Sequence, residues 1–519
     1  RQVKSLEATD FPSDFANLVI ITNSTEQGVV DEALRLLQPG RGIGLIGGAG
    51  GEGKTILRDF PGSTSLKISG KDYVQLKRAP NANIGEWTHL YGRPDNTAFG
   101  GEPLGGAKTA TDLEVLWIGR PGPRYQADRN GRKPSPLSIN GRLFIQGLER
   151  IITIDAHNGT ILWSLELPNF RRFNMPRDCS NWCADSESVF AAIGDRCWKI
   201  HGQTGRIVQR YPVIGGPNKS WEYDWGYIAS EGELLVGSAV KKGTANTDFW
   251  GSGGWYDSKA GGVTHKVCSD SLFALYKEDG NTAWKYSKGL IINPTITISD
   301  GRVCFIETRN PIVMASNARR LGAPEMWLNQ FLVALDLHSG QKLWEKPIDT
   351  PDGDVVFYMA CGSEVLATVV SRRAGKKGLY HINTWDAKTG KEKWQTSFGW
   401  SNEGHHGSHM SRPVIVGNTL AVRPNLYNLR TGEPLALKMP GGGCGTYAAT
   451  TNTFLFRSGT VTMWDHTSGK KSTWSRLRPD CWLSTIPAGG MLLSPEGGGG
   501  CSCGVWLETS LAFRPVSRK

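Results

Sequence analysis

The sequence predicts a mainly β protein in which one hairpin unit is repeated around a ring. Three observations lead to this prediction. A short phrase recurs along the chain, each full copy pairs a glycine turn with a following tryptophan, and the 519 residues include 65 glycines and 19 tryptophans. Repetition of one supersecondary unit at intervals of tens of residues is typical of solenoids and propellers.

The recurring phrase is DAHNGTILW at 155–163. The other full copies lie at 276–284, 335–344, 385–394 and 464–474, and weaker copies that start at His201 and Tyr427 keep the turn without the tryptophan. A β-prone run precedes each turn, and the glycine supplies the positive φ that a tight hairpin needs. Because each second strand places a tryptophan where it can wedge between neighbouring four-stranded sheets, the phrase predicts a β-propeller.

The spacing of the turns predicts eight blades, with seven as the alternative. Turn glycines lie at positions 159, 205, 280, 340, 390, 432 and 469. We expect an eighth blade to combine 113–119 with the C-terminal strand 510–515, because closure by both ends of the chain removes the exposed sheet edges. The two longest intervals, from 205 to 340, indicate insertions, and insertions on a propeller form loops on its faces.

Residues 1–80 do not carry the repeat and are expected to form a small α/β segment ahead of the propeller at 81–519. A buried strand at 16–23 is followed by an amphipathic helix at 29–40 that ends at Pro-Gly, and then by a second strand. The runs LKISG and YVQLKR predict a terminal β-pair. The segment 48–55 matches the phosphate-loop pattern, but no helix of useful length follows it, so we expect a glycine-rich loop and no nucleotide site.

The D-A-x-x-G-x-x-x-W phrase resembles the repeat of pyrroloquinoline-quinone (PQQ)-like β-propellers, over roughly residues 85 to 519. That superfamily includes quinoprotein dehydrogenases and the scaffold propeller of outer-membrane protein assembly, so the resemblance implies a fold and leaves the function open. Longer phrases, among them GEWTHLYGRPDNTA from Gly85, are similar to large propeller proteins of planctomycete-type bacteria. Some of these proteins carry a methyltransferase-like domain, whose closing half residues 1–80 resemble.

The resemblance also implies what this chain lacks. Quinoprotein dehydrogenases place a disulfide between adjacent cysteines over the quinone and hold calcium or a lanthanide with Glu, Asn and Asp. This chain has no adjacent cysteine pair, so PQQ binding is in doubt and none of those ligands is assigned. The glycine-rich motif for S-adenosylmethionine belongs to the missing front half of the methyltransferase-like segment, so no S-adenosylmethionine is expected. No Cys-x-x-Cys-His is present, so no covalent haem is expected.

Composition limits the location and the partners. The net charge is +11, with basic and acidic residues interleaved, which predicts a solvated basic surface and no nucleic-acid partner. No apolar run approaches the length of about 18 residues that spans a membrane, so no transmembrane segment is expected. The chain starts at Arg1 without a signal peptide, so we expect a processed or excised chain. Ten cysteines favour an oxidising, extracytoplasmic compartment, either periplasmic or in the cell envelope.

Three clusters are candidate sites. The first is the histidine-rich segment 400–410, in which His405, His406 and His409 could hold a transition metal such as Zn, Cu, Mn or Fe. Its alternative is a loop whose histidines bond backbone carbonyls. The second is the Cys-x-Cys of Cys501 and Cys503, which could ligate a metal or form disulfides, and disulfides are the favoured interpretation.

Cysteines elsewhere in the chain have simpler interpretations. Cys179, Cys183 and Cys197 lie close together in the sequence, and a disulfide among them is expected. Cys268, Cys304 and Cys361 are expected to be buried strand residues.

The third cluster is aromatic and fills the longest insertion. Its indoles, which suit a sugar ring or a flat quinone, are Trp221, Trp225, Trp250 and Trp255. Candidate acid and base groups beside them are Tyr223, Asp224, Asp257 and His265. The alternative is a lid that folds on its own aromatic side chains.

These clusters leave two function classes open. The first is an extracytoplasmic propeller with a pocket on one face, which binds a small molecule or saccharide and acts as a metal-dependent oxidoreductase or carbohydrate-active enzyme. The second is a non-catalytic scaffold that binds a protein or a cell-envelope polymer. The repeat predicts the architecture, and the segments outside the repeat (215–268, 400–410 and the cysteine-bearing tail) are where function is expected.

Overall fold

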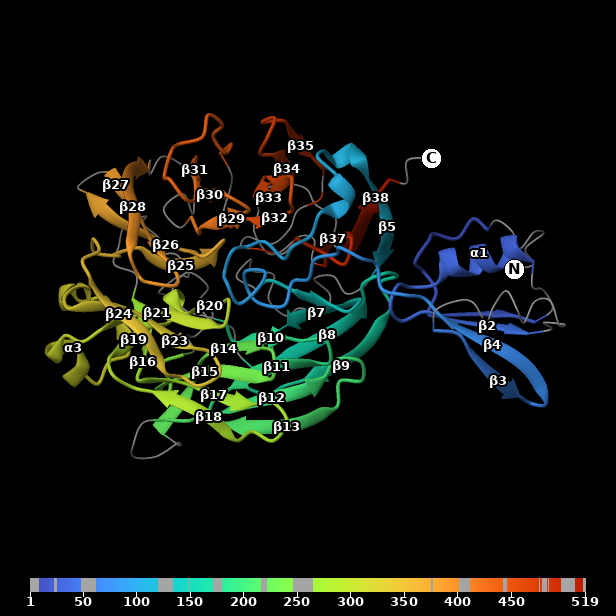
Figure 1. The fold of residues 1–519 in the computed structure, drawn as a ribbon, viewed down its shortest axis with the longest axis horizontal. Coiled ribbons are helices and arrows are strands. Elements are labelled where there is room, and N and C mark those ends of the chain that lie inside the picture. The colour runs from blue at the N-terminus through green and yellow to red at the C-terminus, as the bar shows by residue number, and fades with distance from the viewer. Residues whose placement is uncertain are drawn as a thin grey trace.

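The structure is a computed structural model of the protein. It describes residues 9–22, 26–47, 62–119, 134–147, 149–170, 180–215, 222–245, 265–374, 377–400, 411–441, 446–475, 477, 483, 485–495 and 509–516. The fold is a β-propeller, with sheets arranged around a central axis and a smaller N-terminal unit at one side (Figure 1).

The N-terminal unit is a four-stranded sheet with one helix. Its elements are β1 (Leu18–Ile21), α1 (Gln27–Leu36), β2 (Ile43–Gly47), β3 (Thr64–Ile68) and β4 (Lys71–Lys77). β1 and β2 are parallel, and α1 forms the crossover between them. The predicted terminal β-pair is confirmed, because β3 and β4 are antiparallel neighbours.

Of the nine sheets that the described residues form, eight lie after this unit. The first three are β6 (Leu137–Ile139), β7 (Arg142–Gly147), β8 (Arg150–Asp155), β9 (Ile161–Glu166); β10 (Trp182–Ala184), β11 (Ser188–Ile193), β12 (Arg196–His201), β13 (Ile207–Pro212); and β14 (Tyr223–Glu231), β15 (Leu234–Lys241), β17 (Ser271–Tyr276), β18 (Thr282–Tyr286). Each has four antiparallel strands, as a propeller blade requires.

The fourth sheet is the largest, with seven strands. It contains β16 (Lys266–Ser269), β19 (Leu290–Ile292), β20 (Thr297–Ser299), β21 (Arg302–Thr308), β22 (Arg320–Leu321), β23 (Gln330–Asp336) and β24 (Lys342–Ile348). Three short helical segments lie in its connections: η5 (Asn293–Thr295), α3 (Pro311–Ala315) and η6 (Pro324–Trp327). Part of the predicted insertion, β16, therefore extends this sheet by pairing with β19 and β22.

Three further sheets follow in chain order. They are β25 (Val356–Gly362), β26 (Val365–Ala374), β27 (Lys377–Asp386), β28 (Glu392–Trp400); β29 (Val414–Val416), β30 (Thr419–Val422), β31 (Asn425–Asn428); and β32 (Ala448–Ala449), β33 (Thr453–Ser458), β34 (Thr460–Asp465), β35 (Lys471–Thr473). The middle one has three strands, and a single bridge between Tyr427 and Pro434 stands where a fourth strand would pair.

The last sheet joins the two ends of the propeller, as the sequence predicted. It contains β36 (Ile486–Ala488), β37 (Met491–Ser494) and β38 (Ser510–Pro515), and its outermost strand is β5 (Leu113–Gly119), which follows η1 (Leu104–Gly106) and η2 (Ala110–Asp112). β38 and β5 are antiparallel, with Ser510 opposite Gly119. The blade number stays a prediction, and the eight sheets favour the higher of the two numbers.

In four of the five full repeats the tryptophan lies over the turn glycine of the next sheet, and in the fifth Trp474 packs against Phe513 of the closing sheet. A Cβ added to Gly205 would lie 2.8 Å from the indole of Trp163, and one added to Gly340 would lie 2.4 Å from the indole of Trp284. Trp117 over Gly159, Trp344 over Gly390 and Trp394 over Gly432 repeat the contact. These glycines have φ between 67 and 80°, so both the backbone and the neighbouring indole exclude a side chain.

Each of these indoles also donates a hydrogen bond to the next sheet. Trp163 Nε1 donates to the carbonyl of Gly202 at 2.9 Å, and Trp284 Nε1 donates to that of Leu337 at 2.7 Å. The predicted wedge between sheets is therefore confirmed. In the weaker copy at His201, Tyr211 of β13 contacts Gly280 and donates from its hydroxyl to the carbonyl of Lys277, so a tyrosine replaces the indole.

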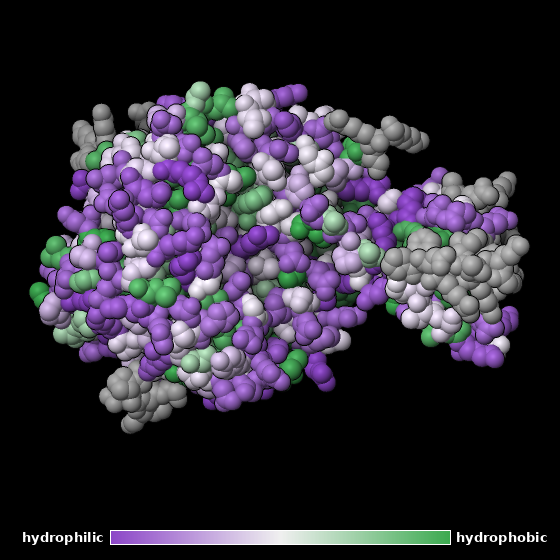
Figure 2. All heavy atoms as spheres, in the orientation of Figure 1, coloured by the Kyte–Doolittle hydropathy of each residue, from purple (hydrophilic) through white to green (hydrophobic). Residues whose placement is uncertain are grey.

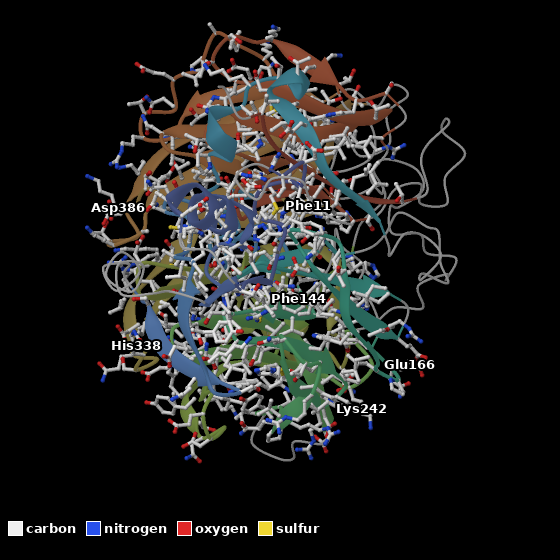
Figure 3. All side chains as sticks on the ribbon, turned by 90° about the vertical axis from the view of Figure 1, so that its right-hand side faces the viewer. Phe11, Phe144, Glu166, Lys242, His338 and Asp386 are labelled. Carbon is white, nitrogen blue, oxygen red and sulfur yellow. The ribbon has the colours of Figure 1, made fainter. Side chains whose placement is uncertain are left out.

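The two faces of the ring have different connections. The turns between first and second strands and between third and fourth strands lie at one end, which we call the turn face. Connections between sheets and between second and third strands lie at the other, the insertion face. Figure 3 places Asp386 and His338, from third-to-fourth-strand turns, on one side, and Glu166 and Lys242, at strand ends, on the opposite side.

The N-terminal unit is attached to the turn face through a buried carboxylate. Asp155, fully buried in the turn after β8, accepts hydrogen bonds from Gln38 Nε2 at 3.0 and 3.1 Å and from Arg41 at 2.6 Å. Two hollows of about 480 Å³ and 320 Å³ lie beside this contact. On the side of the molecule seen in Figure 2, hydrophobic residues lie scattered among hydrophilic ones.

The structure corrects one cysteine prediction and confirms another. Cys183 and Cys197 are free and fully buried, so the expected disulfide does not involve either of them; Cys179 lies outside the described residues. The two lie on β10 and β12 with β11 between them, about 10 Å apart by strand spacing, beyond the reach of a disulfide. Cys268, Cys304 and Cys361 are buried strand residues, as predicted, and burial raises the pKa of Cys268 and Cys361 to about 12.

No described helix is both long and apolar enough to cross a bilayer.

The indole contact predicts a large loss of stability when it is removed. Trp284→Ala should lower the free energy of unfolding by about 3–5 kcal/mol, because a buried aromatic side chain and its hydrogen bond are lost together. Trp284→Phe keeps most of the packing and should cost about 1–3 kcal/mol for the unsatisfied Leu337 carbonyl. Guanidinium unfolding followed by circular dichroism measures both. The exposed Ile312→Ala is the control, and a Trp284→Ala loss no larger than this control would contradict the prediction.

Candidate functional site

Four of the predicted site residues are described, and three of them are consecutive on β14. Tyr223 is half-buried and packs against Gly215, and Asp224 is buried, with its Oδ2 accepting a hydrogen bond from the backbone N–H of Gly243 at 2.7 Å. Because successive strand residues point to opposite faces of a sheet, Tyr223 and Asp224 do not face the same space. The structure therefore does not bring this predicted acid–base pair together.

The other two described residues differ in burial. Trp225 is 1% exposed and packs edge-on against Phe273 at a ring separation of 5.0 Å. Its indole also lies where a side chain at Gly237 would be, so it belongs to the core between neighbouring sheets. His265 is exposed, one residue before β16.

The remaining predicted site residues lie outside the described residues and stay predictions. They are Asp257, Trp221, Trp250, Trp255, His405, His406, His409, Cys501 and Cys503. Their described neighbours in the chain can be placed. Ala245 and His265 border the segment 246–264, and Trp400 and Ser411 border the segment 401–410. These border residues lie at the insertion-face ends of their strands, so both segments start and end on the same face of the ring.

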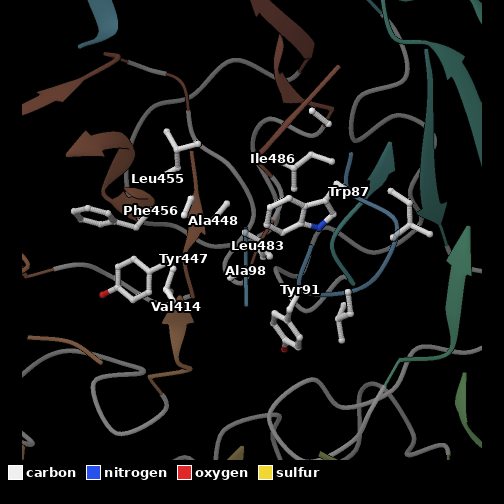
Figure 4. Close-up of a cluster of buried hydrophobic side chains, with 14 of the residues drawn as sticks. Trp87, Tyr91, Ala98, Val414, Tyr447, Ala448, Leu455, Phe456, Leu483 and Ile486 are labelled. Atoms are coloured by element: carbon white, nitrogen blue, oxygen red, sulfur yellow. The ribbon is translucent and has the colours of Figure 1, made fainter. Parts of the chain in front are cut away.

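Residues 85–102, which we call the axial segment, run through the centre of the ring. In Figure 1 this part of the chain passes between the sheets, and Figure 4 shows Trp87, Tyr91 and Ala98 among side chains such as Tyr447, Ala448 and Ile486. Trp87 is fully buried. A Cβ on Gly85 would lie 2.2 Å from the backbone nitrogen of Glu102, so the two ends of the segment meet too closely for a side chain there.

The axial segment is hydrogen-bonded to all eight sheets. Seven of the contacts are backbone bonds, in which the axial acceptors are the carbonyls of Gly85, Trp87, Thr88, Pro94, Asp95, Thr97 and Ala98, and the donors are Gly489, Ser138, Ala184, Ile298, Cys361, Ile415 and Ala449. The eighth joins the backbone N–H of Ser230 to His89 Nε2 at 3.1 Å. The segment thus forms a hydrogen bond with the axis side of every sheet, and it fills the axis near the turn face.

A buried carboxylate closes the axial segment on itself. Glu102 is fully buried and accepts hydrogen bonds from the backbone N–H groups of Gly85 at 2.9 Å, Leu104 at 2.7 Å and Gly490 at 2.8 Å. Burial raises the pKa of Glu102, and the three backbone donors act in the opposite direction. Glu102 therefore links both ends of the segment to the sheet that closes the ring.

Above the axial segment, toward the insertion face, the described residues leave a small cavity. Its volume is about 20 Å³, and its lining includes His89, Tyr91, Asn96, Ser180 and Arg412. Pockets for drug-sized ligands are about 300–1,000 Å³. The described residues therefore do not fit a PQQ molecule at this point of the axis.

The ionisable groups near the cavity are strongly affected by burial. His89 is 4% exposed, and burial together with the nearby Lys277 lowers its pKa to about 3. Burial raises the pKa of Asp95 to about 6. Near pH 7 the imidazole of His89 is neutral, which suits its acceptance of a hydrogen bond from the N–H of Ser230.

Several buried polar groups at the insertion-face ends of the sheets have no hydrogen-bond partner. They are both amide atoms of Gln146, Trp182 Nε1, Arg412 Nε and Thr446 Oγ1, and each of these residues is 3% exposed or less. Buried polar groups in proteins are as a rule satisfied by protein, ordered water or ligand. These four residues lie in or just before strands of four different sheets, and polar occupants are expected beside them at the insertion face.

Among the described stretches of chain, no three His, Cys, Asp or Glu side chains are arranged to hold a metal ion. The predicted metal ligands belong to stretches outside this description.

Sequence reasoning missed the axial segment and Arg412. The phrase GEWTHLYGRPDNTA stood out as unlike the repeat, but it occurs once and has no period that would place it at the axis. Arg412 follows the histidine-rich segment directly, and nothing in its local sequence indicates that its neighbours are Tyr91 and Tyr358.

The comparisons with known proteins agree with the fold. No protein-family profile and no curated protein sequence matches the chain. Among solved structures, the chain is similar to the quinohemoprotein alcohol dehydrogenase from Comamonas testosteroni, with 12% identity over 84% of this chain and 81% of the other, and a TM-score of 0.52. This likeness shows a β-propeller fold.

Two other solved structures are less similar. BamB from Moraxella catarrhalis shares 13% identity over 66% of this chain and 82% of its own, with a TM-score of 0.36. The computationally designed Ika8 protein shares 10% identity over 77% and 99%, with a TM-score of 0.46. At these scores neither likeness bears on function.

The buried His89 predicts a pH dependence of stability. Its pKa is lowered in the folded protein, so the unfolded chain binds the proton more tightly and stability falls as pH drops from about 6.5 toward 3. The slope contributed by this one group approaches about 1.4 kcal/mol per pH unit. Asp95, whose pKa is raised, contributes with the opposite sign between its ordinary value and about 6.

His89→Gln should therefore flatten the acid side of the stability curve. Denaturant unfolding at a series of pH values between 4 and 7 measures the slope for both proteins, and the difference isolates His89 from Asp95. The exposed turn residue His338 supplies the control, His338→Gln, which should leave the slope unchanged. Equal slopes for wild type and His89→Gln would refute the assignment.

Proposed function

We propose that this protein is a ligand-binding propeller whose site lies on the insertion face, around the ring axis. The observation that carries the proposal is the group of unpartnered buried polar atoms on Gln146, Trp182, Arg412 and Thr446. An amide, an indole N–H, a guanidinium and a hydroxyl together recognise a polar ligand through hydrogen bonds, and the aromatic side chains nearby offer flat contact surfaces.

The arrangement of the two faces supports this choice. The turn face carries the N-terminal unit and the axial segment, which leaves the insertion face for recognition. The long insertion and the histidine-rich segment both begin and end there. A saccharide or another small polyol is the ligand class that best matches this combination of donors, acceptors and aromatic rings.

The cellular location and the role of residues 1–80 belong to the same proposal. We place the protein outside the cytoplasm, in the periplasm or the cell envelope, where the basic surface would meet acidic polymers. The methyltransferase-like resemblance is assigned to a structural unit that supports the propeller. Its buried contact through Asp155 is consistent with such a support.

Removal of one unpartnered hydroxyl tests the site. Thr446→Val keeps the shape of the side chain and should weaken saccharide binding by roughly 5- to 100-fold, which corresponds to about 1–3 kcal/mol for a lost buried hydrogen bond. Titration calorimetry with a panel of neutral and acidic oligosaccharides measures the affinity. Thr462→Val is the matched control, because Thr462 is also a buried, unpartnered hydroxyl but lies on β34.

The outcomes of this experiment separate the function classes. Saccharide binding that Thr446→Val weakens and Thr462→Val leaves unchanged supports the proposal. Binding that both variants retain, or a wild type that binds no saccharide in the panel, contradicts it. In the second case, saturable binding of a protein or an insoluble envelope polymer would instead favour the non-catalytic scaffold.

The second candidate function is a metal-dependent oxidoreductase or carbohydrate-active enzyme on the same face. It is favoured by the position of Trp400, which ends β28, and Ser411, which precedes β29, because both lie at the insertion face. The backbone N–H of Ser411 donates to the hydroxyl of the fully buried Tyr380 at 2.7 Å. In this reading His405, His406 and His409 hold the metal, and Asp257 and His265 supply acid and base groups.

Metal analysis of the purified protein tests this candidate. We expect one transition metal per chain, which the double variant His405→Ala, His409→Ala should lose while its circular dichroism spectrum stays unchanged. Substitution of the turn histidine, His338→Ala, is the control and should retain the metal. Wild-type protein without stoichiometric metal would exclude the candidate.

A further inference from the structure

Arg412 is a buried cation beside the axial cavity. It is 3% exposed, and its guanidinium lies between two tyrosine rings, with Cζ 3.5 Å from the centre of the Tyr91 ring and 4.0 Å from that of Tyr358. Tyr91 belongs to the axial segment and Tyr358 to β25, so the arginine links the axis to a blade. This stacking fixes the plane of the guanidinium.

The charge of Arg412 is not neutralised by the side chains around it. Its guanidinium is hydrogen-bonded to the side chain of Tyr358, but its Nε has no hydrogen-bond partner, and no carboxylate of the described residues forms a salt bridge with it. An arginine stays protonated in proteins, and a buried charge without a counter-charge is strongly unfavourable. Cation–π contact with two rings offsets part of this cost. A negative occupant nearby would supply the missing charge.

Two other arginines of similar burial provide a comparison. Arg319, 5% exposed, pairs with Asp270 at 2.7 Å. Arg142, 6% exposed, donates to the carbonyl of Ser186 at 3.1 Å, although its Nε, like that of Arg412, has no partner. Arg412 differs from both in lining the cavity while its guanidinium lies between two tyrosine rings.

The cavity that Arg412 lines has room for one water molecule or one small ion. A volume of about 20 Å³ exceeds the roughly 10–15 Å³ that one water molecule needs and is far below the volume of an organic ligand. The nearby amides are already engaged: Asn96 Nδ2 donates to the carbonyl of Ile296 at 2.9 Å and Asn293 Nδ2 to that of Gly226 at 3.2 Å. Arg412 is therefore the charged donor available to an occupant.

We propose that this cavity binds one monatomic anion, namely chloride, as the counter-ion of Arg412. The anion would stabilise the contact between the axial segment and the blades by neutralising a charge buried between them. The proposal shares Arg412 with the proposed saccharide site but assigns its guanidinium to the anion, and it does not require saccharide binding, because the cavity is too small for a sugar ring. A protein that binds no saccharide would still bind the anion.

The first test uses the wild-type protein. Crystals grown with sodium bromide in place of sodium chloride should show an anomalous bromine peak in contact with the guanidinium of Arg412. In solution, the linewidth of the ³⁵Cl nuclear magnetic resonance signal should increase with protein concentration and fall when bromide competes. A water molecule at this position in bromide-grown crystals would overturn the proposal.

The second test uses stability as the readout. Chloride should raise the unfolding midpoint of the wild type relative to gluconate at equal ionic strength, and each tenfold increase in chloride above its dissociation constant should add about 1.4 kcal/mol. Arg412→Met should remove this chloride dependence. The control Arg142→Gln, at a buried arginine that does not line the cavity, should keep it.

Three outcomes of the stability test would overturn the proposal. One is an equal midpoint in chloride and gluconate, and another is an Arg412→Met protein that retains the full chloride dependence. The third is protection by acetate but not by chloride, which would assign the charge to an organic carboxylate. If Arg412→Met does not fold, the bromide peak and the chloride linewidth of the wild type still decide the question.

Discussion

An indole ring from one sheet lies over the turn glycine of the next, and this contact couples the propeller from blade to blade. Gly340 has no room for a Cβ because Trp284 occupies that space, and Trp284 Nε1 bonds the carbonyl of Leu337 in the same turn. One residue pair thus provides close packing, a satisfied buried N–H and a fixed angle between sheets. Trp117 of β5 lies over Gly159 of the first blade in the same way. The sheet that closes the ring is therefore joined to the first blade by the same kind of contact.

The axial segment adds a second form of coupling that acts from the centre. The indoles connect each sheet only to the next one, whereas residues 85–102 connect all eight sheets to a single stretch of backbone. Together, the indole contacts and the axial hydrogen bonds hold the sheets to one another in the turn-face half of the molecule. The unpartnered polar side chains of Gln146, Trp182 and Thr446 lie toward the opposite, insertion face, where the connections between sheets lie. The fold therefore separates structural rigidity and recognition onto opposite ends of the same strands.

The sequence predicted the features that repeat or that follow from local pattern. The turn at Gly159, the wedge at Trp163 and the pairing of 113–119 with 510–515 were all foreseeable, because each follows from a period or from the need to close sheet edges. Trp225 was predicted as a binding platform, and strand alternation instead places it in the core against Phe273. Arg412 was not predicted, because its environment consists of Tyr91 and Tyr358, which are distant in sequence and meet only when the ring has formed. Most of the predicted site residues lie outside the described residues, and their roles stay predictions.

The closure of the ring by β5 and β38 also sets the order in which the molecule can be completed. β5 is among the first propeller strands to be synthesised, and its partner β38 is the last. Until β38 emerges from the ribosome, β5 is an open edge, and the axial segment ahead of it has only some of the blades that will bind it. Such long-range pairing makes folding slow and leaves unpaired strands open to association with other chains. A nascent propeller therefore depends on being shielded until β38 has been made, and a propeller without β38 keeps β5 as an unpaired edge.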